Sequence, residues 1–171
     1  MKQFMVPATL AGLCAVAVGG AIFLGADSIG GSEETAPAQQ EQVTTGFGSG
    51  QTVTLYKSPT CGCCAVYADA LREEGFAVDV RNTRDMRSVK TEHQIPLEGE
   101  SCHTSLIGDY VVEGHVPLEA IEKLLSEQPE VAGIGLPSMP LGTPGMPGPK
   151  AAPYEIYQLS ADGVMSPYLT L

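Results

Sequence analysis

Basic side chains are scarce in this chain. Of its 171 residues only nine are Lys or Arg, against twenty Asp and Glu, and the formal net charge at pH 7 is -11. This balance opposes binding to nucleic acids and to anionic lipid surfaces. The sequence also lacks a Ser-His-Asp order, a paired-carboxylate signature and a glycine-rich loop that cradles phosphate. We therefore expect no nucleic-acid partner and find no support for a hydrolase or a nucleotide-binding protein.

Charge is also missing from the N-terminal segment. No charged residue lies between Lys2 and Asp27, and the run is mostly apolar. An export signal and a single membrane anchor both require such a segment, so both interpretations stay open for residues 1–26. Because Lys2 favours a cytoplasmic location for this end, we expect the remainder in the periplasm or cell envelope, with membrane contact only through this segment. Residues 27–51 are mostly small or polar, which predicts a flexible tether.

Residues 52–171 carry the pattern of one folded α/β domain. Alternating apolar residues predict strands, and apolar residues at helical spacing predict helices, in the order β-α-β-α-β-β-α. Gly108-Asp109 is typical of a hairpin turn between the third and fourth strands. From Gly133 to Pro149, ten of seventeen residues are Gly or Pro, which predicts a loop and neither a helix nor a central strand. Ala161-Asp162-Gly163 predicts a C-terminal hairpin.

Three thiols lie at a predicted strand-to-helix turn, in the CGCC segment Cys61–Cys64. A Cys-x-x-Cys after the first strand is the thioredoxin-like pattern, and a helix N-terminus favours thiolate over thiol. In proteins that this pattern resembles, a cis-proline usually precedes the third strand. Here that region reads Ser-Cys-His-Thr, with no proline. The resemblance implies that Cys102 and His103 come close to Cys61 and Cys64, with the sulfurs of Cys61 and Cys102 within disulfide or metal-bridging reach.

Such a cluster fits a soft metal ion. Thiolates suit Cu(I) and also Zn(II), with imidazole and thioether as supplementary donors. The candidate ligands are Cys61, Cys63, Cys64, Cys102, His103, Met139 and Met146. Alternatives remain: the cysteines form two structural disulfides in an oxidising compartment, and the methionines only pin a loop. A lone His is more often structural than a ligand, so we expect structural roles for His93 and His115.

Four motifs occur in a fixed order along the chain. They are CGCC at Cys61–Cys64, SCHT at Ser101–Thr104, EGHVP at Glu113–Pro117, and a Met/Gly/Pro segment at Leu136–Pro147. In these motifs the chain resembles a family of exported copper-binding proteins long catalogued as a domain of unknown function. The resemblance implies metal handling in the cell envelope.

Two functions follow as hypotheses. The first is a binding protein that holds Cu(I), or less favourably Zn(II), and buffers it or passes it to another envelope copper protein. The second is a thiol-disulfide oxidoreductase, in which Cys61 attacks and Cys64 resolves. The missing proline disfavours the enzyme, because Cys102 in its place competes for the same sulfurs.

Overall fold

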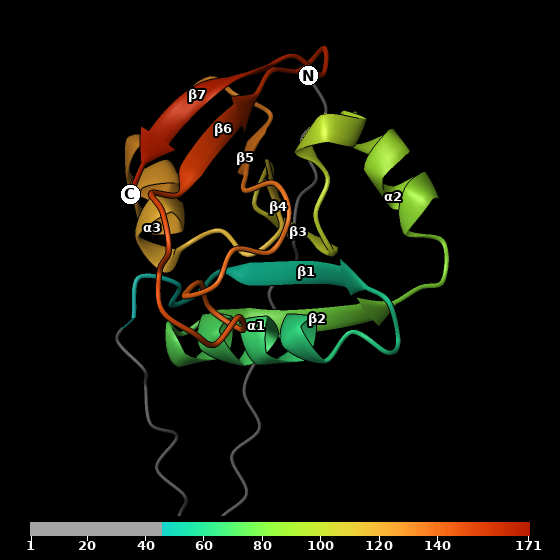
Figure 1. The fold of residues 1–171 in the computed structure, drawn as a ribbon, viewed down its shortest axis with the longest axis vertical. Helices are drawn as coiled ribbons and strands as arrows, with labels where there is room; N and C mark the ends of the chain where they lie inside the picture. Colours follow the sequence, from blue (N-terminus) through green and yellow to red (C-terminus); the bar gives the residue numbers. More distant parts are fainter. Residues whose placement is uncertain (1–45) are drawn as a thin grey trace, which may run out of the picture. The chain divides into compact units, whose positions relative to one another are not determined.

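The computed structural model describes residues 46–171, and these form a mixed α/β fold (Figure 1). The predicted leader at residues 1–26, and most of the predicted tether, lie outside the described residues. The elements in chain order are β1 (Thr52–Lys57), α1 (Gly62–Glu73), β2 (Ala77–Asn82), α2 (Met86–Glu92), the 3-10 turn η1 (Leu97–Gly99), β3 (His103–Ile107), β4 (Tyr110–Glu113), α3 (Leu118–Glu127), β5 (Gly133–Gly135), β6 (Glu155–Leu159) and β7 (Met165–Thr170).

The strands make one sheet of seven, in the order β2-β1-β3-β4-β5-β6-β7. β1 pairs with β2 in parallel and with β3 in antiparallel, and β3 pairs with β4 in antiparallel. The predicted α/β class, the element order up to α3 and both hairpins are confirmed. The register places Lys57 of β1 opposite His103 of β3. The end of β1, where the CGCC segment follows, therefore lies beside the start of β3.

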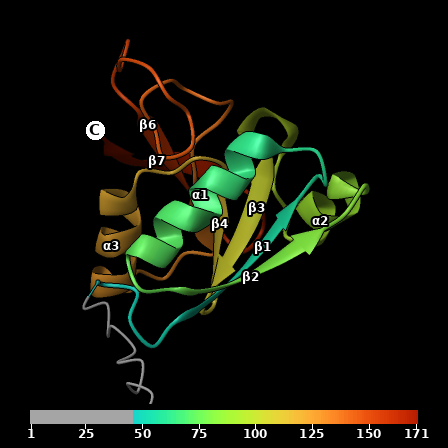
Figure 2. The same cartoon turned by 90° about the horizontal axis from the view of Figure 1, so that it is seen from below.

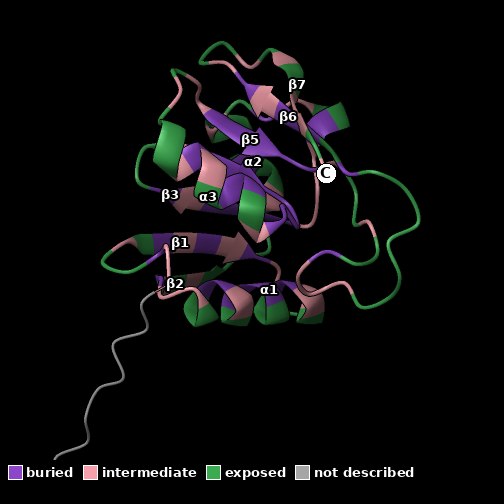
Figure 3. Ribbon diagram, turned by 90° about the vertical axis from the view of Figure 1, so that its left-hand side faces the viewer, coloured by how far each residue is buried: buried purple, intermediate pink, exposed green. Residues whose placement is uncertain are grey.

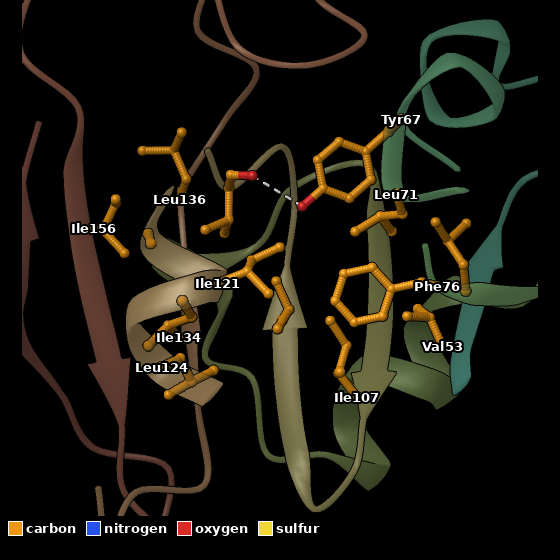
Figure 4. Close-up of a cluster of buried hydrophobic side chains, with 14 of the residues drawn as sticks. Val53, Tyr67, Leu71, Phe76, Ile107, Ile121, Leu124, Ile134, Leu136 and Ile156 are labelled. Carbon is orange, nitrogen blue, oxygen red and sulfur yellow. Dashed lines mark hydrogen bonds between the residues drawn. The ribbon is translucent and has the colours of Figure 1, made fainter. Parts of the chain in front are cut away.

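Hydrophobic residues pack on both faces of the sheet. The larger cluster joins α1 and α3 to the strands and includes Val112. Two of its other members, Tyr67 and Ile121, are labelled in Figure 4. The smaller cluster includes Val111 and Leu159. Because side chains alternate along a strand, the neighbours Val111 and Val112 point to opposite faces. α1 lies across one face of the sheet (Figure 2), and its outward side is exposed (Figure 3).

The expectation of no central strand in the Gly/Pro-rich segment is wrong at its start. Gly133–Gly135 forms β5, which pairs in parallel with β4 and in antiparallel with β6. A Cβ at Gly133 would lie 2.0 Å from the Val111 carbonyl oxygen, and one at Gly135 would lie 2.3 Å from the Tyr157 ring. These glycines allow neighbouring groups to approach closely, which is a recognised use of glycine inside a strand.

The packed region begins before Thr52. Phe47 makes an edge-on contact with Phe76, with ring centroids 5.3 Å apart, and the Gly48 amide donates to the Glu74 carbonyl. The last residues of the predicted tether therefore pack against the domain, because one aromatic ring can bury area that its small polar neighbours cannot. Among the described residues, no helix is both long enough and apolar enough to cross a membrane.

Candidate metal centre

The first half of the site lies at the start of α1. Cys61 is the N-cap residue, and Cys63 and Cys64 lie in the first turn. Lys57, at the end of β1, donates from its ammonium group to the carbonyl oxygens of Ser58 and Cys61. These bonds fix the turn between β1 and α1. We call Cys61, Cys63 and Cys64 the helix half of the site.

The helix half is oxidised in this structure. Cys61 and Cys64 form a disulfide, whereas Cys63 and Cys102 are free. The Sγ of Cys63 lies 3.4 Å from that of Cys61. The loop closed by this disulfide is only three residues in sequence separation, so it removes little entropy from the unfolded chain. Its value to the fold is small, and a role in the chemistry of the site is the better explanation.

The second half of the site comes from the β3–β4 hairpin. Cys102 immediately precedes β3, His103 begins it, and His115 follows β4. The Gly114 amide donates to the His103 carbonyl and closes this end of the hairpin. Gly114 has a φ of +79°, and a Cβ there would lie 2.5 Å from the side chain of Ser101. Only glycine permits this turn. We call Cys102, His103 and His115 the hairpin half.

The two halves meet at Cys64 and Cys102. Their sulfurs lie 3.5 Å apart, although the residues are 38 positions apart in sequence. The Cys102 sulfur lies 3.0 Å from Nε2 of His115 and 3.3 Å from Nδ1 of His103. Two overlapping ligand groups result, and the ligand atoms in each lie within 4.8 Å of one another: Cys61, Cys63, Cys64 and Cys102, and Cys64, Cys102, His103 and His115.

The predicted convergence of the two segments is confirmed, but the sulfur 3.5 Å from that of Cys102 belongs to Cys64 and not to Cys61, which the sequence predicts. Cys61 lies in the same group, within 4.8 Å of Cys102. The sequence favours a structural role for His115, and the structure places this residue in the second ligand group. The EGHVP motif carried the signal for His115, but its contact with Cys102 depends on the hairpin that brings them together. His93 caps the C-terminus of α2.

Burial sets the protonation of the hairpin half. It raises the pKa of the Cys102 thiol to about 12, and the Cys63 thiol adds to this effect. Burial lowers the pKa of His103, with further contributions from His115 and Lys90, and it lowers the pKa of His115. Both imidazoles are therefore neutral at pH 7, which is the form that binds a metal.

Hydrogen bonding also aims the rings. Nδ1 of His115 donates to the Pro144 carbonyl at 2.7 Å, so the neutral ring presents the Nε2 lone pair to Cys102. His103 is fully buried, and its Nε2 has no hydrogen-bond partner among the described residues. A buried nitrogen without a partner is costly unless a ligand satisfies it. Two neutral imidazoles and clustered sulfurs match the donors that suit Cu(I).

Tyr67 of α1 packs against both imidazole rings. Its ring centroid lies 4.5 Å from that of His103 and 5.4 Å from that of His115. Its hydroxyl donates to the Val116 carbonyl at 2.9 Å (Figure 4). The ring excludes water from one side of the site, and the hydroxyl is already satisfied by the backbone. Tyr67 thus lines the site.

The Met/Gly/Pro segment reaches the site through its backbone. A Cβ at Gly145 would lie 2.5 Å from the Cys63 carbonyl oxygen and 3.2 Å from the His115 ring. Met139 is 47% exposed, and Met146 lines a surface hollow beside Val66 of α1. Ligation by Met139 and Met146 stays a prediction.

A protein-family model and two solved structures match this chain. The family model described as "Protein of unknown function, DUF411" matches residues 99–146. A solved structure titled "Copper resistance protein copG- Form 2" shares 34% sequence identity with a TM-score of 0.66, over 71% of this chain and 98% of that chain. A structure of Form 1 shares 34% identity with a TM-score of 0.65, over 70% and 96% of the two chains. No curated protein matches the chain.

The chain belongs to the DUF411 family. The two matched structures are titled copper resistance proteins, so the family resemblance stated from the four motifs is confirmed. The matched residues 99–146 contain SCHT, EGHVP and most of the Met/Gly/Pro segment, and the structures extend the match across most of the domain. The cysteine cluster fits copper binding.

Proposed function

We propose that this protein holds Cu(I) in the cell envelope, through thiolates of both halves of the site, and buffers it or passes it to another envelope copper protein. One observation carries the proposal: the Cys102 sulfur lies within reach of the Cys64 sulfur and of two neutral imidazoles. Thiolate and imidazole together suit Cu(I), and Zn(II) is the weaker alternative. The uncharged, mostly apolar run behind Lys2 supports the location, because an export signal or a membrane anchor requires such a segment.

Full affinity requires the reduced protein. A disulfide between Cys61 and Cys64 removes both thiolates from the ligand set. Partial exposure of Cys61, Cys63 and Cys102 gives an ion a route in and out, whereas Cys64 is buried. The arrangement therefore suits exchange with a partner better than permanent retention.

An anaerobic titration of the reduced protein with Cu(I), against a competing chelator, tests the proposal. We expect tight binding of Cu(I). We expect no binding of Zn(II) in the presence of a chelator that competes equally strongly for Zn(II). Cys14→Ser is the matched control, because this thiol lies in the predicted leader and should leave the affinity unchanged. Absence of binding to the reduced wild-type protein would refute the proposal.

A second candidate, thiol-disulfide exchange, is favoured by one specific contact. The Cys102 sulfur lies 3.5 Å from Cys64 of the Cys61–Cys64 disulfide. Attack by the Cys102 thiolate on Cys64 forms a Cys64–Cys102 bond and releases Cys61 as a thiolate, so electrons balance within the protein. If exchange with substrates is the function, Cys61→Ser abolishes reduction of a model disulfide, and Cys102→Ser slows it, because the attack on Cys64 is lost.

A further inference from the structure

Among the residues that the structure describes, Glu113 carries the most deeply buried carboxylate near the metal centre. Its side chain is 1% exposed. Oε1 accepts from the Ser101 amide at 2.6 Å and from the Lys90 ammonium, and Oε2 accepts from the Thr104 hydroxyl at 2.6 Å. Three donors from α2 and from the segment around β3 thus meet on one carboxylate.

Two of these donors bracket the hairpin ligands. Ser101 and Thr104 stand on either side of Cys102 and His103, so the carboxylate holds both ends of the two-residue ligand segment. The same carboxylate lies two residues before His115, across the tight turn at Gly114. A shift of Glu113 would therefore move three candidate ligands relative to α1.

The Glu113 network acts from the face of the sheet opposite His103. Thr104 contacts Lys90 of α2, whereas its neighbour His103 packs against Tyr67 of α1. Successive side chains of a strand point to opposite faces, which places the carboxylate behind the ligand strand. Glu113 would act on the ion through the backbone of Ser101–Thr104, which leaves the sulfur and the imidazoles free to bind.

Stability alone does not explain a buried ion pair here. The Lys90–Glu113 pair is 5% and 1% exposed, and the desolvation cost of such a pair commonly cancels its electrostatic attraction. An apolar pair would fill the same space. A carboxylate, however, can accept from an N–H, an O–H and an ammonium at once. That capacity is needed to fix a backbone segment in one position.

We propose that Glu113 is a positioning residue that holds Cys102 and His103 at the spacing the metal requires. The inference rests on the proposed Cu(I) site. Groups that orient metal ligands from outside the coordination sphere typically change metal affinity by about 10- to 100-fold when they are removed. The effect expected of Glu113 is of this size.

Two double variants separate positioning from charge. Lys90→Met with Glu113→Leu removes the ion pair and the hydrogen bonds to Ser101 and Thr104. Lys90→Met with Glu113→Gln removes the same charges, but the amide oxygen still accepts from Ser101 and the amide nitrogen can donate to Thr104. Glu119→Gln, at an exposed acid in the first turn of α3, is the control for a lost surface charge.

The reduced full chain of each variant is titrated with Cu(I), and X-ray absorption at the copper edge reports the sulfur and nitrogen ligands. The Leu double variant should lose about 10- to 100-fold in affinity with a changed ligand shell, and the Gln double variant should stay near wild type. Wild-type affinity in a folded Leu double variant overturns the inference, as does an equal loss in both. No binding by wild type refutes the Cu(I) site itself.

Thr104 gives an independent test if the Leu double variant does not fold. Thr104→Val removes one donor to Glu113 and should weaken Cu(I) binding by about fivefold, the worth of one hydrogen bond. Thr104→Ser keeps the hydroxyl and should restore the affinity and the X-ray absorption spectrum of the wild type. Equal affinities for the Val and Ser variants would overturn the inference.

Discussion

The helix half and the hairpin half of the site supply their ligands under different constraints. Cys61 and Cys63 are partly exposed on the first turn of α1, and Cys61 is tied up in a disulfide. In the hairpin half, His103 and His115 are fully buried and held by the backbone at Gly114 and Pro144. The helix half can therefore change its redox state, whereas the hairpin half keeps its geometry. A site built this way combines a responsive set of thiols with a fixed set of imidazoles.

Loss of Cys102 should lower Cu(I) affinity the most, because this thiol belongs to both ligand groups. We expect Cys102→Ser to lower Cu(I) affinity by more than about 100-fold, beyond the range typical of groups outside the coordination sphere. Competitive Cu(I) titration measures it. If Cys102→Ser lowers Cu(I) affinity no more than Cys61→Ser does, Cys102 does not link the two halves of the site.

Oxidation should affect only the helix half. With the Cys61–Cys64 disulfide formed, the site keeps Cys63, Cys102 and the imidazoles. We expect Cu(I) affinity to fall by at least about tenfold, because thiolates are the ligands that Cu(I) prefers. The same titration on protein oxidised and then reduced again is the control, and it should recover full affinity. Equal affinities in both redox states would show that Cys61 and Cys64 do not bind the ion.

Acid should weaken binding through the hairpin half. Burial raises the pKa of Cys102 to about 12, so this thiol is protonated at neutral pH and must lose its proton to the solvent when the metal binds. The proton competes with the metal, so affinity falls as pH falls, by about tenfold per pH unit for each proton displaced. Titrations at pH 6, 7 and 8 measure the slope. A pH-independent affinity would contradict binding through Cys102.

His115→Gln should produce a smaller loss, about tenfold, because one imidazole is a supplementary donor beside several thiolates. His93→Gln is the matched control, since His93 caps α2 away from the ligand groups. The copper-edge spectrum should lose nitrogen scattering only in the first variant. Unchanged spectra and affinity would return His115 to the structural role expected from sequence.

The methionines should matter least. Met139→Leu and Met146→Leu keep side-chain volume but remove the thioether, a weaker and uncharged donor, so we expect changes in affinity below about threefold. A larger loss in the Met146 variant would mean that the loop brings its thioether to the ion. Cu(I) competition with each single variant and with the pair measures this.

Local patterns predicted most of the fold. Alternation at Val53 and Leu55, the turn at Gly108-Asp109 and the helical spacing after Pro117 each depend on neighbours in sequence, and the structure confirms them. β5 was missed because two of its three residues are glycine, and their close packing against Val111 and Tyr157 is a tertiary property.

The site was predictable in part for the same reason. Cys102 and His103 followed from the thioredoxin-like pattern, which fixes where the start of the third strand lies. The contact between His115 and Cys102 depends on a turn and joins residues 13 positions apart. The position of Glu113 depends on a buried ion pair with Lys90, 23 positions away. No sequence period marks such contacts.

In the proposed site, one Cu(I) ion binds where the helix half and the hairpin half meet. A crystal structure of the reduced protein with Cu(I), with the ion located by anomalous scattering at the copper edge, tests it most directly. We expect copper bonded to the sulfurs of Cys64 and Cys102 and to a nitrogen of His103 or His115. Copper held only by Cys61 and Cys63, or by the methionine loop without Cys102, would contradict it.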